Sequence, residues 1–299
     1  MNKATQAMIG LAGLTATLSA KAEWGLNMTK GVTDLSLEVY NLHMLALWVC
    51  VVIGVIVFGA MIYSMIKHRK SKGYQAATFH ESTKAEILWT VVPVIILISL
   101  AMPAATALIK IEDSSNADMT IQVTGYQWKW HYEYPEEGIT FFSSMADDSR
   151  EASALGSSID PSTVDNYLLE VDNPVVIPVG KKVRFLFTSN DVLHAWWVPD
   201  FAVKKDAVPG FINDMWAKVN TPGTYRGQCA ELCGKDHAFM PIVVIAKEQA
   251  EYDAWVAEQV ASADATKAES EKTWDQASLM TQGEAVYNKN CAACHQAGG

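Results

Sequence analysis

The sequence predicts a two-helix transmembrane hairpin followed by an all-β sandwich of the Greek-key type, with the start of an all-α domain at its C-terminal end. Three observations predict this class. Two long apolar runs come first, short runs of β-branched and aromatic residues separated by turn residues follow, and the last part is rich in Ala, Glu, Lys and Gln. A chain that is 50% hydrophobic and only 19% charged is typical of a membrane-attached protein.

The N-terminal residues 1–22 are predicted to be a signal peptide. Lys3 precedes an apolar stretch of small residues from Ala7 to Ala20, and an A-x-A pattern follows at residues 20–22. A signal peptidase cuts after such a pattern, so the mature chain would begin near Glu23.

The membrane segment is predicted to lie within residues 23–115. Uncharged apolar runs extend from Met44 to Ile66 and from Ile87 to Ile109, and each is long enough to cross a bilayer, which takes about 20 residues. We therefore expect transmembrane helices over about 42–67 and 86–110. Pro93 and Pro103 fall inside the second helix and predict a kink.

Charge predicts the topology and the class of partner. Basic residues predominate between the two runs, so this loop is expected in the cytoplasm: Lys67, Arg69, Lys70, Lys72 and Lys84. The rest of the chain would then face the periplasmic or outer side of a bacterial inner membrane, as part of a multi-pass protein. A formal net charge of −10 argues against a nucleic acid as a partner, and indicates either a basic partner or a plain soluble surface.

Residues 116–247 are predicted to form the sandwich, because short strand-like runs recur between turn residues. The expected strands are 120–134, 167–172, 174–180, 182–189, 194–200, 214–220, 223–228 and 241–247. The Ser-rich, acidic stretch from Ser143 to Asn166 is expected to be a surface loop. A helix and linker are predicted over 248–280, with residues 262–271 as the linker.

The stretch from Gly227 to Pro241 carries the ligands of a copper site. Thiolate and thioether are soft donors and imidazole is intermediate, and this combination is typical of copper electron-transfer centres. His194 would arrive from another strand. Two thiolates set between two imidazoles suit a pair of copper ions bridged by both sulfurs, and the ligands within the stretch are Cys229, Cys233, His237 and Met240.

The two cysteines allow two other interpretations. An exported protein can oxidise Cys229 and Cys233 to a disulfide, and a structural zinc site can use Cys and His. The disulfide would leave His194, His237 and Met240 without a role, and zinc seldom recruits methionine.

The C-terminal residues 281–299 are predicted to be the start of a cytochrome c domain. Cys291, Cys294 and His295 form C-x-x-C-H, in which both thiols bond a c-type haem and the histidine is an axial ligand; a chance match is the alternative. Because no second axial methionine follows before Gly299, this haem domain is expected to be incomplete.

Together these motifs resemble subunit II of haem-copper cytochrome c oxidases over about Leu35 to Ala246. The resemblance implies a cupredoxin-like sandwich that holds the dinuclear copper centre called CuA. It implies that Cys229 and Cys233 bridge the metals and that His194 and His237 are terminal ligands. It further implies that Met240 is a weak ligand to one copper.

Other roles are implied by the same resemblance. Glu231 would offer its backbone carbonyl to the second copper and its side chain to a magnesium ion at the boundary with subunit I. Trp128 would be the exposed indole through which electrons enter from cytochrome c, although Lys129 stands where the family often has an aromatic residue. Glu86 would lie at the entrance of a proton path, or be an ordinary juxtamembrane charge.

Two further groups of residues complete the expected site. Acidic residues that would surround the docking site of a basic cytochrome are Glu133, Asp172 and Asp191, which are otherwise plain surface carboxylates. An alternating aromatic run is expected to place all its members on one face of a strand, with core packing as the other interpretation for most of them: Tyr126, Trp128, Trp130, Tyr132 and Tyr134.

The predicted function is electron transfer in a respiratory terminal oxidase. The chain would accept electrons from cytochrome c, or from its own fused haem c, and pass them to subunit I, where oxygen is reduced to water with proton pumping. The expected partners are oxidase subunits I and III, cytochrome c and the lipid bilayer, and no oxygen chemistry is expected on this chain alone. The rival functions are a CuA domain of a nitrous-oxide-reductase-like enzyme and a membrane-anchored copper-delivery protein.

Overall fold

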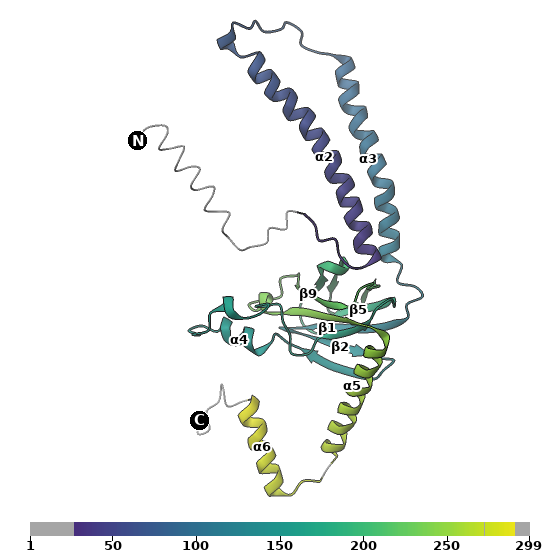
Figure 1. Cartoon of the computed structure of the whole chain (residues 1–299), viewed down its shortest axis with the longest axis vertical. Helices are drawn as coiled ribbons and strands as arrows, with labels where there is room; N and C mark the ends of the chain where they lie inside the picture. The colour runs from purple at the N-terminus through teal and green to yellow at the C-terminus, as the bar shows by residue number, and fades with distance from the viewer. Residues whose placement is uncertain (1–26, 272, 291–299) are drawn as a thin grey trace.

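The computed structural model describes residues 27–271 and 273–290. The predicted signal peptide and the C-x-x-C-H motif lie outside these residues. A long helical hairpin leads into a β-sandwich, and two helices follow it at the C-terminal end (Figure 1).

The hairpin consists of α2 (Asp34–Lys67) and α3 (Thr83–Glu112), which are apolar and long enough to cross a membrane. Helix α2 begins before the predicted residue 42 because Thr33 and Ser36 form a capping box, in which each side chain bonds the other residue's backbone N–H. Helix α3 continues through both of its prolines.

Several bonds attach the hairpin to the sandwich. The Thr33 hydroxyl donates to the carbonyl of Phe201 at 3.0 Å, and the Trp216 indole donates to the carbonyl of Lys110 at 3.0 Å. Lys110 also pairs with Glu38 of α2 at 2.9 Å. The sandwich is therefore held at the end of the hairpin by contacts with both helices.

The sandwich has two five-stranded sheets. The first has the order β3 (Ile139–Ser143), β2 (Lys129–Tyr134), β1 (Met119–Tyr126), β5 (Val183–Ser189) and β8 (Asn213–Ala217). The second has the order β4 (Val175–Pro178), β10 (Pro241–Lys247), β9 (Gly223–Cys229), β6 (His194–Val198) and β7 (Val203–Ala207). Pairs β1–β5 and β4–β10 are parallel and the other pairs are antiparallel. The predicted β-sandwich is confirmed, and β7 is a strand that the sequence did not predict.

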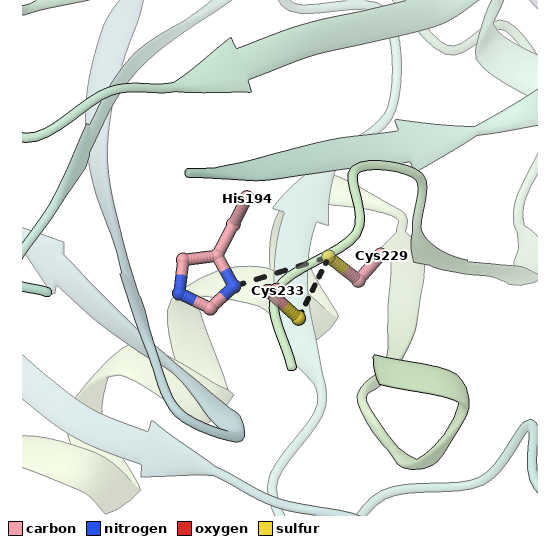
Figure 2. Close-up of side chains that lie close together, drawn as sticks. All are labelled: His194, Cys229 and Cys233. Atoms are coloured by element: carbon pink, nitrogen blue, oxygen red, sulfur yellow. Dashed lines mark hydrogen bonds between the residues drawn. The ribbon is translucent and has the colours of Figure 1, made fainter. Parts of the chain in front are cut away.

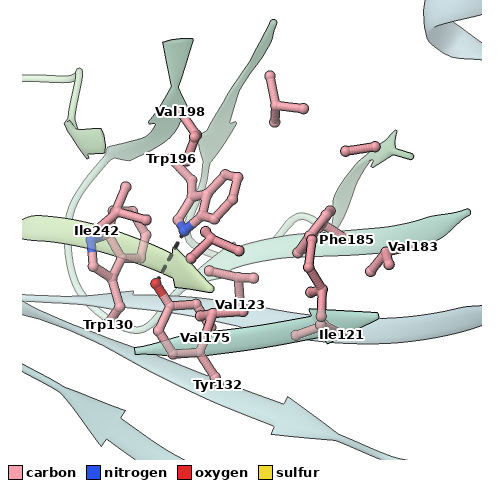
Figure 3. Close-up of a cluster of buried hydrophobic side chains, with 14 of the residues drawn as sticks. Ile121, Val123, Trp130, Tyr132, Val175, Val183, Phe185, Trp196, Val198 and Ile242 are labelled. Atoms are coloured by element: carbon pink, nitrogen blue, oxygen red, sulfur yellow. Dashed lines mark hydrogen bonds between the residues drawn. The ribbon is translucent and has the colours of Figure 1, made fainter. Parts of the chain in front are cut away.

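Aromatic residues from both sheets fill the core (Figure 3). The Trp196 indole on β6 donates to the Tyr132 hydroxyl on β2 at 3.1 Å, and its ring stacks on Phe185 of β5 at 5.1 Å between centroids. Trp196 thereby connects the two sheets two residues after His194, the first residue of β6.

The aromatic run is not one strand, contrary to the prediction. Strand β1 ends at Tyr126 and β2 starts at Lys129, and these two residues pair with each other, so the chain reverses at Gln127 and Trp128. Tyr126 and Trp128 are partly exposed, whereas the other three aromatic side chains are buried in the core: Trp130, Tyr132 and Tyr134. Alternation in the sequence could not reveal this turn, because it lacks glycine and proline.

Three other predicted segments differ from the structure. Residues 167–172 make only an isolated bridge from Val171 to Met145, and the loop 143–166 contains the short helix α4 (Asp147–Ser153) and a 3-10 turn, η3 (Pro161–Thr163). The expected linker 262–271 is mostly helical, because α5 (Gln249–Ser270) continues through residues that favour helices. Helix α6 (Gln276–Asn290) follows. The remaining short turns are η2 (Lys70–Lys72), η4 (Pro199–Phe201) and η5 (His237–Phe239).

Replacing Tyr134 with Phe should destabilise the sandwich. The Tyr134 hydroxyl donates to the Val176 carbonyl at 2.9 Å and accepts from the Val176 N–H at 3.0 Å, so its loss leaves buried backbone groups unpaired. We expect the free energy of unfolding to fall by about 1–3 kcal/mol. Urea unfolding of the detergent-solubilised chain, followed by tryptophan fluorescence, measures it. Tyr126→Phe is the control. An equal loss of unfolding free energy in both variants would contradict the stabilising role of the Tyr134–Val176 hydrogen bonds.

Candidate metal centre

Neighbouring strands bring the two halves of the site together. His194 is the first residue of β6 and Cys229 the last residue of β9. These strands pair with Trp196 opposite Cys229, and the N–H of Ala230 donates to the carbonyl of Ala195 at 2.9 Å. Gly227 makes this close pairing possible, because a Cβ there would lie 1.9 Å from the Trp197 carbonyl oxygen.

Four side chains lie in the order imidazole, thiol, thiol, imidazole (Figure 2 shows the first three). His194 Nδ1 is 3.9 Å from Cys229 Sγ, and the two Sγ atoms of Cys229 and Cys233 are also 3.9 Å apart. Cys233 Sγ is 3.5 Å from Nδ1 of His237. The first three residues are buried, and their ligand atoms lie within 4.8 Å of one another.

Two further predicted ligand residues, Glu231 and Met240, contact Cys229 through their backbone carbonyls. Its Sγ is 3.4 Å from the backbone carbonyl oxygen of Glu231, and its N–H donates to the carbonyl of Met240 at 3.1 Å. Met240 is 1% exposed and belongs to the same buried cluster as both cysteines. All the predicted ligand residues therefore gather around one loop and the start of β6.

The thiols differ in acidity because they share one small volume. Burial raises the pKa of Cys229, but its interactions with His194 and with nearby backbone groups outweigh burial and lower it to about 7. Burial and then the neighbouring Cys229 charge raise the pKa of Cys233 to about 12. Without a cation the pair thus favours one thiolate, and a metal held by both sulfurs would remove the repulsion that opposes the second.

The cysteines form no disulfide in the structure, since both thiols are free and their sulfur atoms are 3.9 Å apart. The donors present are two sulfurs, two imidazoles, a thioether and a carbonyl. This set fits a soft or intermediate transition metal such as copper.

Trp128 connects the protein surface to the cysteine loop. Its indole N–H donates to the Cys233 carbonyl at 3.1 Å, and the side chain of Gln127 donates to the same oxygen at 2.9 Å. Lys235 lies over the Trp128 ring, 5.7 Å from its centroid. An open cavity of about 610 Å³ adjoins the indole, and its lining includes Gln127, Trp128, Lys129, Arg150, Asp236 and Phe239.

The predicted acidic residues occupy different settings. Asp172 accepts from the N–H groups of Ser144 and Asn173, both at 2.7 Å, and Glu133 lies 3.5 Å from His131. Asp191 instead contacts the site itself, because one of its oxygens lies 2.9 Å from Nε2 of His194. Glu86 is exposed in the first turn of α3.

Sequence reasoning missed two residues that shape the site. A Cβ on Gly125 would lie 2.7 Å from the His194 ring, so only glycine leaves room for the imidazole. A single glycine within a strand pattern is a known sign of such close approach and could have pointed to it. Gln127 carries no comparable signal. The predicted haem ligands Cys291, Cys294 and His295 lie outside the described residues.

The fold and the site define a class: a β-sandwich joined to two helices long and apolar enough to cross a membrane, with a cluster of thiols and imidazoles that could hold a metal. Comparisons with known proteins specify it further. The family model for the cytochrome c oxidase subunit II periplasmic domain matches residues 119–247, and the model for that subunit's transmembrane domain matches residues 21–106.

Individual relatives agree with these matches. A probable cytochrome c oxidase subunit 2 from Rickettsia bellii is 38% identical over 235 residues, covering 78% of this chain and 84% of the relative. Cytochrome c oxidase subunit 2 from Cereibacter sphaeroides is 33% identical over 267 residues, covering 83% and 88%. The solved periplasmic domain of subunit II from Bradyrhizobium japonicum is 42% identical and covers 50% of this chain and 98% of that one, with a TM-score of 0.44.

This chain belongs to the cytochrome c oxidase subunit II family. It is therefore an electron-transfer subunit of a haem-copper oxidase, and it has a transmembrane and a periplasmic domain. The resemblance noted in the sequence is confirmed.

In the metal-free protein, Cys229 and Cys233 should lose their protons at clearly different pH values. In a background with Cys50, Cys291 and Cys294 replaced by Ser, we expect one thiolate to form near pH 7 and the second only at much higher pH. Because a metal needs deprotonated sulfur, metal affinity should fall as the pH drops below about 7. Thiolate absorbance near 240 nm measures the titration.

Removing one thiol provides the control for that titration. In Cys229→Ser the pKa of Cys233 should fall, because the neighbouring charge that helps to raise it is gone. Two thiols that titrate together at the ordinary cysteine value would contradict this account.

Proposed function

We propose that this chain accepts electrons from cytochrome c at a CuA centre and passes them to subunit I of its oxidase. The observation that carries the proposal is the imidazole, thiol, thiol, imidazole order, with the two sulfurs adjacent and one imidazole beside each. Two copper ions would be held by Cys229 and Cys233 together with His194 and His237. Such a centre stores and releases one electron.

The protein's own part is to hold these donors nearly fixed. His194 and Cys229 are backbone neighbours across β6 and β9, and Met240 leads directly into β10. We propose Met240 as a weak ligand to one copper and the Glu231 carbonyl as a ligand to the other. Donors on paired strands move little when the charge of the site changes by one, which keeps the structural cost of electron transfer low.

Trp128 is proposed as the point where electrons enter. It is partly exposed beside the cavity, and its hydrogen bond to the Cys233 carbonyl links the surface to a ligand residue. Glu133 and Asp172 would steer a basic cytochrome c toward this surface. The haem c expected on Cys291, Cys294 and His295 would be a second, covalently attached donor.

Exposed apolar side chains near the ligands suit a surface for the partner subunits. Leu193 precedes His194 and Leu232 precedes Cys233, and both are exposed. Phe211 and Ile212 are 67% and 72% exposed, and they closely follow Pro209, which forms a bridge with Ser189 in the segment before Leu193. We propose that this patch contacts subunit I, which reduces oxygen to water and pumps protons.

Further assignments follow from the same proposal. The Glu231 side chain would bind magnesium at the subunit I boundary, and Glu86 would lie at a proton path. Subunit III and lipid would contact the hairpin, whose apolar residues are largely exposed. We place the chain in a bacterial inner membrane with the copper domain on the periplasmic side. Its transmembrane match argues against a soluble nitrous-oxide-reductase domain, and the buried ligands argue against a copper-delivery protein, which must release its metal.

The Trp128→Phe variant tests this function. We expect stopped-flow reduction of the copper-loaded chain by cytochrome c to slow at least about tenfold, equivalent to about 1.4 kcal/mol in the barrier, because the indole and its bond to the Cys233 carbonyl are lost. The visible spectrum of the centre should stay unchanged. Trp197→Phe is the matched control, since Trp197 lies on β6 and is also partly exposed. Equal rates in both variants would contradict the assignment of Trp128.

A further inference from the structure

His194 makes a polar contact on each side of its ring. Nδ1 faces Cys229 Sγ at 3.9 Å, and Nε2 lies 2.9 Å from Oδ1 of Asp191. The imidazole is fully buried, whereas the Asp191 side chain is 28% exposed. A carboxylate that contacts a buried metal-ligand candidate has a different environment from one that only faces solvent.

We propose that Asp191 is a positioning residue for His194, not primarily a docking residue for cytochrome c. A carboxylate only accepts hydrogen bonds, so Nε2 must carry a hydrogen, which leaves the lone pair of the neutral ring on Nδ1, the nitrogen that faces Cys229. The proposal rests on the proposed function, because its consequence for the metal assumes the copper centre.

The carboxylate of Asp191 is itself fixed in place. Oδ2 accepts from the backbone N–H of Gln127 at 2.8 Å, and Oδ1 accepts from the N–H of Val192 at 2.7 Å. The Ser189 hydroxyl lies 3.4 Å from Oδ1. Bonds to both oxygens hold the plane of the carboxylate, so it can set the direction of the imidazole N–H.

The rest of the pocket leaves the ring little freedom. Gly125 lies against the His194 ring with no room for a Cβ, and Trp130 meets the ring edge-on at 5.9 Å between centroids. Packing therefore limits the ring's position, and Asp191 selects which nitrogen faces the cysteines.

Gln127 extends this arrangement across the site. Its backbone N–H supports Asp191, while its side-chain amide donates to the carbonyl of Cys233 at 2.9 Å. The turn between β1 and β2 thus contacts Asp191, the partner of His194, and also the backbone of Cys233. We therefore expect a substitution of Asp191 to change the reduction potential of the metal centre.

The two possible roles of Asp191 predict different measurements. A docking carboxylate alters the rate of association and its salt dependence, and leaves the centre unchanged. A carboxylate bonded to a ligand imidazole makes that ligand more basic and stabilises the more positive, oxidised centre. Loss of its charge should therefore favour the reduced form and raise the reduction potential.

The experiment uses the full chain in detergent with Asp191→Asn. We expect its equilibrium between the oxidised and reduced copper centre to shift about tenfold toward the reduced form, which corresponds to about 59 mV for one electron. Asp118→Asn is the matched control: Asp118 also accepts a backbone N–H, from Lys182, but lies next to the opposite end of β1 from Gly125. Asp172→Asn represents a docking carboxylate, and both should shift the equilibrium less than twofold.

Asp191→Glu separates position from charge. It keeps the negative charge but moves the carboxylate by one methylene, so the positioning role predicts a changed equilibrium and a docking role predicts none. If Asp191→Asn does not fold, the equilibrium measured for Asp191→Glu distinguishes the positioning role from the docking role. Unchanged equilibria in both Asp191 variants, with only the association rate altered as in Asp172→Asn, would overturn the proposal.

A second readout does not need copper. In the metal-free chain, above the pH at which His194 becomes neutral, ¹⁵N NMR should show hydrogen on Nε2 in the parent and in Asp118→Asn, and a mixture of tautomers in Asp191→Glu. Failure of the chain to bind two coppers would refute the proposed function and leave this test intact. An unchanged tautomer in Asp191→Glu would refute the positioning role alone.

Discussion

The structure depends most on the antiparallel contact between β6 and β9, which sets His194 beside Cys229. It is a backbone constraint, maintained by the Trp196–Cys229 pairing, by the Ala230 to Ala195 hydrogen bond and by the absence of a side chain at Gly227. Strand pairing positions the candidate ligands. The packing energy that stabilises the sandwich therefore also stabilises the geometry of the site. Two thiols, of which Cys229 has a lowered pKa and Cys233 a raised one, are therefore held close together by the backbone alone.

A second level of organisation surrounds the ligands. The turn at Gln127 and Trp128 contacts the Cys233 carbonyl and, through Asp191, the far side of His194. The same turn borders the open cavity on the surface. The turn that borders the surface cavity and the turn that contacts the candidate ligands are therefore one short piece of chain, and the sandwich that carries it is hydrogen-bonded to the hairpin at Thr33 and Lys110.

Much of this could be predicted from the sequence, because long apolar runs and a dense set of soft donors are local signals. These signals predict both apolar helices and the residues that the structure brings together at the candidate site. The turn at Gln127 was missed because it lacks turn residues, and β7 because its charged Lys204, Lys205 and Asp206 hide the strand pattern. The contact between Asp191 and His194 is a tertiary one, so no local pattern in the sequence predicts it. A glycine inside a strand pattern, such as Gly125, does indicate close approach of another group, which here is the His194 ring.

The most direct test of this account is the copper content and electron paramagnetic resonance of the purified chain after anaerobic loading. An adjacent pair of thiols with one imidazole on each side predicts two tightly bound coppers per polypeptide, with a multi-line hyperfine pattern from one unpaired electron shared between both nuclei. One copper per chain with a single-nucleus spectrum, or metal that is readily lost, would contradict the central claim.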